Sequence, residues 1–179
     1  MKKILAFGAS NSTKSINKQL ARYAADQLTD FEITFIDLND FDIPIYSIDR
    51  ENDTGFPPHA VHFDQLVRTS DGILISFAEH NGNFSTAFKN IFDWKSRLGS
   101  STWEGRKMFL LSTSPGQRGG AGVMEIALKT LPYNGGNIVA HFSLPSFYDN
   151  FSAVEGIKNE ELKAAFTEQL NLFKGSFGE

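Results

Sequence analysis

Five apolar runs, each followed by a segment with the periodicity of an amphipathic helix, constrain the fold of this chain more than any other feature. The runs cover residues 3–7, 32–37, 72–77, 107–112 and 137–142. Their centres, such as Ile73-Leu74-Ile75, are continuously apolar, which is typical of strands buried on both faces. Helical patterns cover residues 17–29, 58–69, 86–97, 120–131 and 160–174. The alternation predicts an α/β fold in which a doubly wound parallel sheet of five strands lies between two layers of helices.

The length of the chain indicates a single domain. Its 179 residues, 41% of them hydrophobic and 17 of them phenylalanine, are enough for one well-buried core and too few for two comfortable ones. We therefore expect one domain over residues 1–179. The longest irregular segment, residues 39–57, contains Pro44, Gly55 and Pro57 and is interpreted as a surface excursion.

Charge and hydropathy exclude several classes of partner. The net charge of −4 is mild, and no basic stripe of the kind that binds nucleic acid is present. No apolar segment approaches the ~18 residues of a membrane span. The apolar run that follows Met1-Lys2-Lys3 is too short for a secretory signal. These observations predict a cytoplasmic protein that binds neither nucleic acid nor membrane.

The chain contains no cysteine, which excludes disulfides, thiolate metal sites and cysteine nucleophiles. The four histidines do not have the spacing of a metal site, so we predict no bound metal. No Ser/His/Asp set or carboxylate pair stands at an obvious catalytic spacing. We therefore predict no catalytic side chain.

The segment between the first strand and the first helix is a candidate phosphate-binding loop. Its residues Ser10, Ser12 and Ser15 offer hydroxyl donors, Lys14 offers a positive charge, and the helix begins near Ile16 and Asn17. A strand, a polar loop and a helix N-terminus in this order direct backbone N–H groups at an anion. In the other interpretation, Ser15 only caps the helix and its neighbours form a solvated turn. The loop alone leaves both open.

With a phosphate loop after the first strand, we expect the strand order 2-1-3-4-5. Ligands of such sheets lie outside the carboxyl ends of the strands, where the strand order reverses. The loops after the third and fourth strands, residues 78–84 and 114–120, would then line the same crevice. Both loops are rich in glycine, amides and hydroxyls. They are better suited to presenting donors to a planar polar ligand than to acid–base chemistry.

Four collinear motifs make the chain similar to the NADPH-dependent FMN reductases of the flavodoxin-like superfamily. The family's phosphate loop, approximately Gly-Ser-x-Arg-x-x-Ser-x-Asn, is matched from Ala9 to Asn17. Its flavin-edge motif is Pro-Glu-Tyr-Asn-Gly followed several residues on by Leu-Lys-Asn-x-x-Asp-Trp. This motif is matched by Ala78-Glu79-His80-Asn81-Gly82 and by residues 88–94. An Asp-Leu…Leu-Pro-Leu-Tyr pattern appears over residues 37–46, and Ser-x-Gly-x-x-Gly-Gly over residues 114–120. The similarity covers most of residues 3–142.

This resemblance implies a flavodoxin-like fold and an FMN-dependent oxidoreductase. Hydride would pass from NADPH or NADH to bound FMN and then to a quinone, free flavin, azo compound or oxidised metal, in a ping-pong sequence. It also implies a homodimer or homotetramer whose partner subunit partly closes the flavin site. The phosphate would lie on Ser10, Ser12, Lys14, Ser15, Ile16 and Asn17, and the ring between Ala78, Glu79, His80, Asn81, Gly82 and Phe84 on one side and Ser114, Gly116, Arg118 and Gly119 on the other.

Three departures from the family pattern bear on flavin affinity and acceptor choice. Ser12 replaces an arginine, and Lys14 could supply the missing charge from two residues later. Ala78 replaces a proline and His80 replaces a tyrosine. Two other functions stay open: a flavodoxin-like electron carrier, against which the mild charge argues, and a non-enzymatic flavin-binding or sensor domain, which Ser12 favours. Arg118 is either an exposed loop charge or a ligand of the NADPH phosphate.

Overall fold

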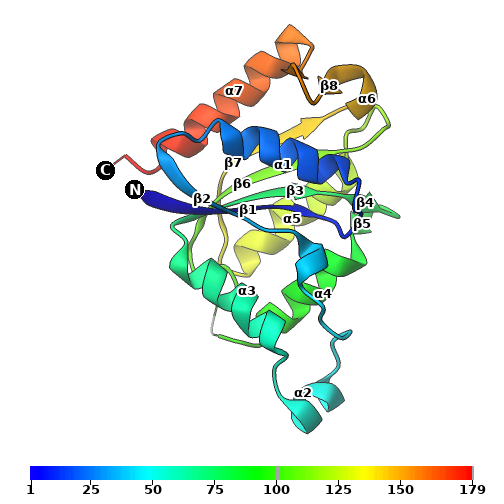
Figure 1. Ribbon diagram of the computed structural model, residues 1–179, viewed down its shortest axis with the longest axis vertical. Coiled ribbons are helices and arrows are strands. Elements are labelled where there is room, and N and C mark those ends of the chain that lie inside the picture. Colours follow the sequence, from blue (N-terminus) through cyan, green and yellow to red (C-terminus); the bar gives the residue numbers. More distant parts are fainter. Residues whose placement is uncertain (100, 179) are drawn as a thin grey trace.

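A parallel five-stranded sheet forms the middle layer of the computed structural model, which describes residues 1–99 and 101–178 (Figure 1). The strands are β1 (Lys2–Ala9), β2 (Phe31–Phe35), β3 (Gly72–Phe77), β6 (Lys107–Thr113) and β7 (Asn137–Leu144). Their order is β2-β1-β3-β6-β7, and every neighbouring pair is parallel. Numbered along the chain, this is the order 2-1-3-4-5, so the predicted doubly wound topology is confirmed.

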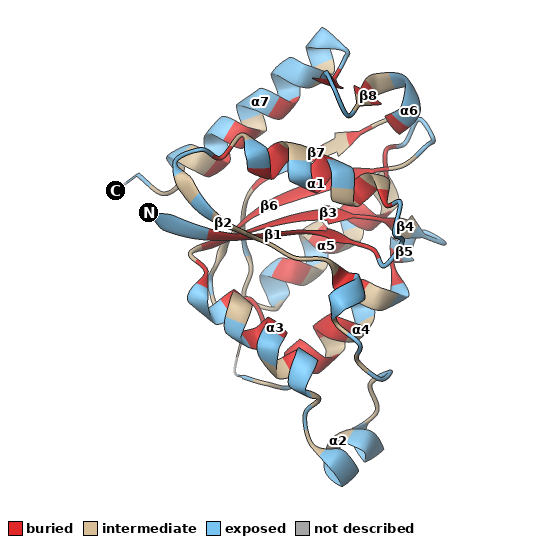
Figure 2. Ribbon diagram, viewed as in Figure 1, coloured by how far each residue is buried: buried red, intermediate tan, exposed pale blue. Residues whose placement is uncertain are grey.

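Two layers of helices cover the sheet, one on each face (Figure 1). One layer holds α1 (Ile16–Asp26) and α7 (Glu160–Gly175), and the other holds α3 (Pro58–Thr69), α4 (Thr86–Lys95) and α5 (Ala121–Tyr133). The residues of these helices that face the sheet are buried (Figure 2). No helix in the described residues is both long enough and apolar enough to cross a lipid bilayer.

The hydrophobic core is divided by the sheet into two clusters. Successive residues of β1 alternate between them, because side chains of a strand point to opposite faces. Leu5 and Phe7 pack with the aromatic residues of α3 and α4, whereas Ile4 and Ala6 pack with α1 and α7. Trp103, which the sequence assigns to the core, is fully buried in the first cluster. Burial on both faces explains the continuous apolar runs from which the strands were predicted.

Element boundaries differ from the predictions at a few ends. The second strand was expected to reach residue 37, but β2 ends at Phe35, where its pairing with β1 ends. Asp37 instead caps a 3-10 helix, η1 (Leu38–Asp40), by accepting the Asn39 N–H. The first helix was expected to reach residue 29, but α1 ends at Asp26, and the N–H of Phe31 bonds to the Leu28 carbonyl in the turn that follows.

Several short elements were not predicted. The excursion of residues 39–57 contains a seven-residue helix, α2 (Ile48–Thr54), which projects from the rest of the molecule (Figure 1). A hairpin of β4 (Glu79–His80) and β5 (Asn83–Phe84) follows β3. After β7 come α6 (Phe147–Asn150) and a second small hairpin of β8 (Phe151–Ser152) and β9 (Gly156–Ile157). Elements this short carry too little periodicity to be found from sequence.

Candidate functional site

A cavity of about 220 Å³ lies at the carboxyl ends of β1, β3 and β6. This is the edge of the sheet at which the strand order reverses and at which ligands of such folds bind. It is lined by Ser10, Ser12, Lys14, Ser15, Ile16, Asn17, Ala78, Glu79, His80, Thr113, Ser114, Pro115 and Tyr148. The cavity thus brings together every residue predicted from the first loop with Ala78, Glu79, His80 and Ser114.

The remaining predicted residues lie beside the cavity without lining it. Asn81 and Gly82 form the exposed tip of the β4–β5 hairpin, and Gly116 and Arg118 are exposed on the loop after β6. Gly119 is buried behind that loop. Phe84 belongs to the core, where its ring centre lies 5.0 Å from that of Phe88 and 5.3 Å from that of Phe77.

The loop after β1 is held by its own hydroxyl groups. The Ser10 Oγ accepts the Ser12 N–H at 3.1 Å, and the Ser15 Oγ accepts the Lys18 N–H at 3.1 Å as the N-cap of α1. The capping role weighed for Ser15 is therefore confirmed. A hydroxyl that accepts one hydrogen bond still has its own proton to donate, so capping does not prevent Ser15 from binding an anion. The first turn of α1 contains no acidic residue, so the helix dipole there is left for an anion.

Asn17 joins the first loop to the ends of two other strands. Its Nδ2 donates to the Thr113 carbonyl at 3.0 Å, and its Oδ1 accepts the Thr113 N–H at 3.0 Å and the Ser76 hydroxyl at 2.8 Å. Because the residue is buried, these bonds fix the start of α1 against β3 and β6. Asn17 thus positions the loop, and its side-chain amide is already occupied by the protein.

The hairpin after β3 turns at Asn81 and Gly82, whose φ angles are 52° and 73°. Two consecutive residues with positive φ are the signature of a type I′ turn, for which Asn-Gly is the preferred pair. A Cβ added to Gly82 would meet no protein atom within 4 Å. Glycine is therefore favoured here by the positive φ angle of the backbone and not by a lack of room for a side chain. The hairpin therefore closes through a left-handed turn at Asn81 and Gly82.

Glu79 fixes the hairpin to the start of α5. Its Oε2 accepts the N–H of Val123 at 3.1 Å. The N-cap of α5 is Gly120, which has no side chain to cap the helix. The Glu79 carboxylate supplies the missing acceptor and places a negative charge at the positive end of the helix dipole. This contact between the hairpin and α5 was not apparent from sequence, since the two partners lie 44 residues apart in the chain.

The loop after β6 owes its shape to two buried glycines. Gly119 and Gly120 have φ angles of 57° and 78°, and a Cβ on Gly119 would lie 2.8 Å from the Leu144 backbone. The Ser112 hydroxyl donates to the Gly119 carbonyl at 2.8 Å. Only glycine combines this conformation with so close an approach of two backbones. The loop is consequently a rigid wall of the crevice.

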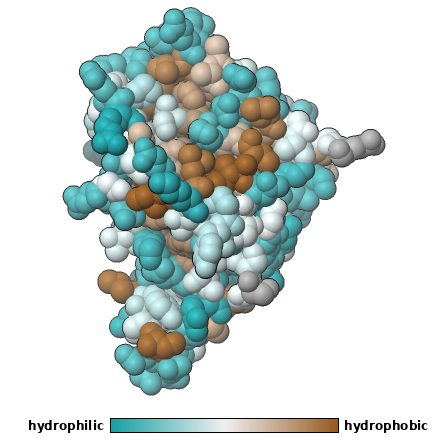
Figure 3. Space-filling view, turned by 180° about the vertical axis from the view of Figure 1, so that it is seen from behind, coloured by the Kyte–Doolittle hydropathy of each residue, from teal (hydrophilic) through white to brown (hydrophobic). Residues whose placement is uncertain are grey.

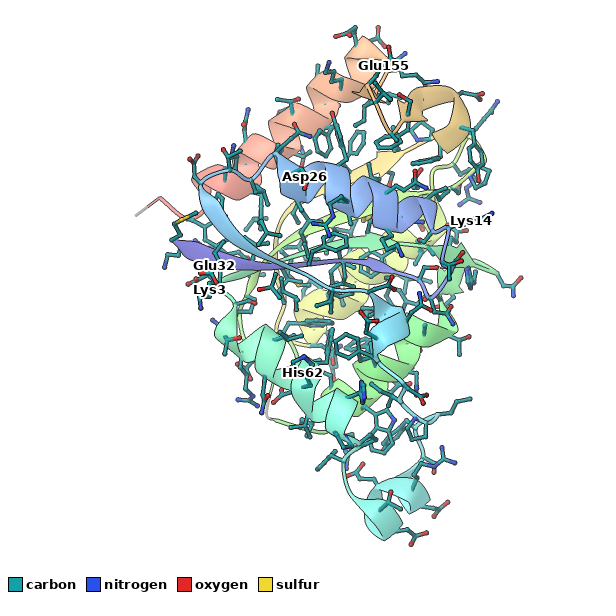
Figure 4. All side chains as sticks on the ribbon, in the orientation of Figure 1. Lys3, Lys14, Asp26, Glu32, His62 and Glu155 are labelled. Carbon is teal, nitrogen blue, oxygen red and sulfur yellow. The ribbon has the colours of Figure 1, made fainter. Side chains whose placement is uncertain are left out.

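Charge distinguishes this cavity from a larger one elsewhere. Lys14 projects from the loop at the N-terminal end of α1, whereas Asp26 lies at the other end of the helix (Figure 4). A cavity of about 540 Å³ beside α1 and the end of β2 is lined by Asp26, Asp37 and Asp40 as well as by Lys18 and Arg22. Three carboxylates disfavour a phosphate, so the cavity lined by Lys14 fits an anion better than the larger one does.

One of these carboxylates, Asp37, forms an ion pair with Lys18, with Lys18 Nζ 2.6 Å from Asp37 Oδ2. Burial raises the pKa of Asp37, but hydrogen bonds from Lys18 and Asn39 outweigh it and hold that pKa below its usual value. The charge of Lys18, which lines the larger cavity, is thereby offset by Asp37, whereas Lys14 lines the smaller cavity.

Three residues of the cavity were missed by the sequence reasoning. Thr113 and Pro115 flank Ser114: Pro115 lies inside the predicted loop of residues 114–120, and Thr113 is the last residue of β6, immediately before that loop. Tyr148 comes from α6, after β7, a strand whose following loop was not expected to reach the crevice. No motif in the sequence marks it.

A family model described as "NADPH-dependent FMN reductase" matches residues 2–149. The chain belongs to this family. The match contains β1 to β7 and all three loops of the crevice, and it confirms the resemblance found from the four motifs.

Similar proteins carry related descriptions. A quinone reductase of Pseudomonas putida is 32% identical over 122 residues, which are 67% of this chain and 64% of the relative. A quinone reductase of Escherichia coli K12 is 34% identical over 80 residues, 45% of this chain and 43% of the relative. The chain therefore spans between two fifths and two thirds of the length of these curated relatives.

A solved structure confirms the flavodoxin-like fold. FerB, a flavoenzyme NAD(P)H:(acceptor) oxidoreductase from Paracoccus denitrificans, superimposes with a TM-score of 0.75. The superposition covers 97% of this chain and 98% of FerB, at 21% sequence identity. At this identity the likeness concerns the fold alone.

Proposed function

We propose that this protein is an FMN-dependent NAD(P)H oxidoreductase that reduces a small acceptor. The observation that carries the proposal is the cavity at the carboxyl ends of β1, β3 and β6, in which Lys14 and the Ser10, Ser12 and Ser15 hydroxyls surround the N-terminus of α1. Hydroxyl donors, an exposed lysine and a helix N-terminus without acidic residues fit a phosphate monoester. Membership of the FMN reductase family supports FMN as the molecule that bears it.

Two groups of residues can hold such a cofactor, one at its phosphate and one at its ring. Ser10, Ser12, Lys14 and Ser15 would bind the phosphate, with Ile16 and Asn17 at the start of the helix behind it. The cavity of about 220 Å³ is smaller than the roughly 300–1,000 Å³ of a site for a whole cofactor-sized ligand, so it suits the phosphate end. The hairpin of residues 79–84 and the loop of residues 114–120 would hold the ring outside it.

When bound, FMN would supply the hydride-transfer chemistry, accepting a hydride from NAD(P)H and passing it to the acceptor. The chain's own contribution is binding and orientation. Backbone N–H groups of the Asn81–Gly82 turn and of the glycine-rich loop would donate to the polar edge of the ring. The rigid anchoring of both loops, through Glu79 and Ser112, keeps those donors in place. No side chain is required as a nucleophile or general base.

A charge inserted into the phosphate loop tests the proposed site. Ser15→Glu should weaken FMN binding at least about tenfold in a fluorescence titration, because it adds bulk and a like charge beside the phosphate. Ser47→Glu is the matched control, since Ser47 caps α2 in the same way, by accepting the Arg50 N–H at 3.1 Å. Unchanged FMN affinity in Ser15→Glu would show that the phosphate lies elsewhere.

We also propose that the protein acts as a homodimer or homotetramer in which a partner subunit partly closes the flavin site. The support is the projecting segment around α2, which exposes Ile45, Ile48 and Phe56, with Ile45 69% exposed. Figure 3 shows apolar surface on this projection, seen from behind. Exposed apolar side chains that gather on a projecting segment favour a contact there. A monomer at all concentrations in sedimentation equilibrium would contradict this arrangement.

A further inference from the structure

Tyr148 is an exposed aromatic residue on the rim of the proposed phosphate cavity. Its side chain lines the cavity that also contains Ser12, Lys14 and Ser15. The residue is 67% exposed, so burial in the core does not explain its presence. It is carried by α6, which lies at the same end of the sheet as the start of α1 and the β4–β5 hairpin (Figure 1).

The backbone that carries Tyr148 is tied to the loop after β6. The N–H of Ser146 donates to the Gly116 carbonyl at 2.9 Å, and the N–H of Phe147 donates to the Ser114 carbonyl at 3.0 Å. These bonds fix the segment that follows β7 against the third loop of the crevice. Tyr148 is therefore placed by the same loop that supplies Ser114 and Pro115 to the cavity.

Packing and backbone strain fix the orientation of this turn. Phe147 is buried and stacks on Phe151 with ring centres 4.8 Å apart, while the Tyr148 ring meets the Phe147 ring edge-on at 5.6 Å. Ser146 has a φ of 45°, a conformation that a non-glycine residue adopts at a cost. Strain of this kind persists only where surrounding contacts enforce it. The turn is thus held in one conformation and presents Tyr148 outward.

From these contacts we propose that Tyr148 is a further FMN-binding residue, whose phenolic hydroxyl donates to the phosphate. This inference rests on the proposed function. Tyrosine combines an apolar ring with a hydrogen-bond donor at its tip, and only two side-chain torsions must be fixed on binding. A donor from the segment after β7 would add a contact to the phosphate from outside the Ser10–Asn17 loop. It would also compensate in part for Ser12, where the family has an arginine.

Equilibrium titrations with FMN and with riboflavin test the inference, because only FMN carries the phosphate. Tyr148→Phe should raise the Kd for FMN about tenfold, as for the loss of a hydrogen bond to a charged group, and leave the Kd for riboflavin unchanged. Tyr148→Ala should weaken FMN at least as much. Tyr133→Phe is the control, since Tyr133 is 92% exposed at the far end of α5.

The outcomes separate this inference from the function on which it rests. Wild-type affinity for FMN in both Tyr148 variants would overturn the role of Tyr148 and leave the reductase proposal intact. An equal loss of affinity for FMN and for riboflavin in Tyr148→Phe would overturn the proposed contact with the phosphate. Wild-type protein that binds neither flavin would contradict the proposed function and this inference together. Circular dichroism of each variant distinguishes loss of binding from loss of the fold.

Discussion

Single residues of the cavity differ in how much freedom the protein leaves them. Both polar atoms of the Asn17 amide are hydrogen-bonded to Ser76 and Thr113. Replacement of Asn17 would therefore disturb the loop, and any effect on a ligand would follow from that disturbance. Lys14 is exposed on the rim, and Ser15 keeps a proton to donate. A direct effect on phosphate binding is therefore expected from Lys14 and Ser15 and an indirect one from Asn17.

Removal of the Lys14 charge should weaken FMN more than riboflavin. We expect Lys14→Ala to raise the Kd for FMN about three- to fivefold, the range of an exposed ion pair, with the effect shrinking as ionic strength rises. Isothermal titration at low and high salt measures both. Lys129→Ala, an exposed lysine on α5, is the control. Equal losses for the two flavins would mean that Lys14 shapes the loop and does not meet the phosphate.

The hairpin tip should be sensitive to backbone changes and tolerant of side-chain changes. Gly82→Val should cut NADPH-driven turnover sharply, because a β-branched residue is strained at the φ of 73° that the turn requires. Glu79→Gln should cost little, since an amide oxygen can still accept the Val123 N–H. Asn81→Gly is the control, as glycine adopts the local φ of 52° without strain. Wild-type turnover in Gly82→Val would show that the conformation of this turn does not matter for holding the flavin ring.

Among the elements, the strands and long helices follow from sequence and the short connections do not. The bounds of β3 and α3 agree with the prediction at both ends, because an apolar run and an amphipathic period define them. The β4–β5 hairpin and α6 depend on contacts between distant segments, such as Glu79 with α5 and Phe147 with Ser114. For that reason the three loops could be predicted as parts of one site, whereas Tyr148 could not.

The interface between α3 and α4 contains an ion pair that could not be predicted from the sequence. Lys95 is fully buried, with its Nζ 2.7 Å from Asp64 Oδ1, and Arg68 contacts the other oxygen of Asp64 at 2.7 Å. Asp64→Asn should lower the free energy of unfolding by about 3–5 kcal/mol, because it leaves the Lys95 charge buried without its partner. Replacing both residues, as in Asp64→Leu with Lys95→Met, should restore much of that loss. Urea unfolding measures both variants, and wild-type stability of Asp64→Asn would contradict the prediction.

The same pair makes stability depend on pH. Burial raises the pKa of Asp64, but the neighbouring Lys95 and Arg68 outweigh it and hold that pKa below its usual value. A carboxylate with a depressed pKa in the folded state stabilises the protein above its unfolded pKa, about 4, and the stabilisation is lost as the pH falls through the folded value. The stability gap between wild type and Asp64→Asn should therefore narrow below about pH 4. A constant gap down to acid unfolding would exclude ionised Asp64 as the cause.

Across the whole molecule, the fold brings three separate loops and the α6 turn to one edge of the sheet. If donor and acceptor alternate on the same face of the flavin, initial-rate plots against NADPH at several quinone concentrations should be parallel. Intersecting lines would show that both are bound together and would contradict a single shared face.

Anaerobic reduction of the FMN-loaded protein tests the central claim most directly. Addition of NADPH or NADH should bleach the visible absorption of the bound flavin, and a quinone added afterwards should restore it. Protein that binds FMN but is reduced by neither nicotinamide would contradict the oxidoreductase proposal and favour an electron carrier or a flavin-binding sensor.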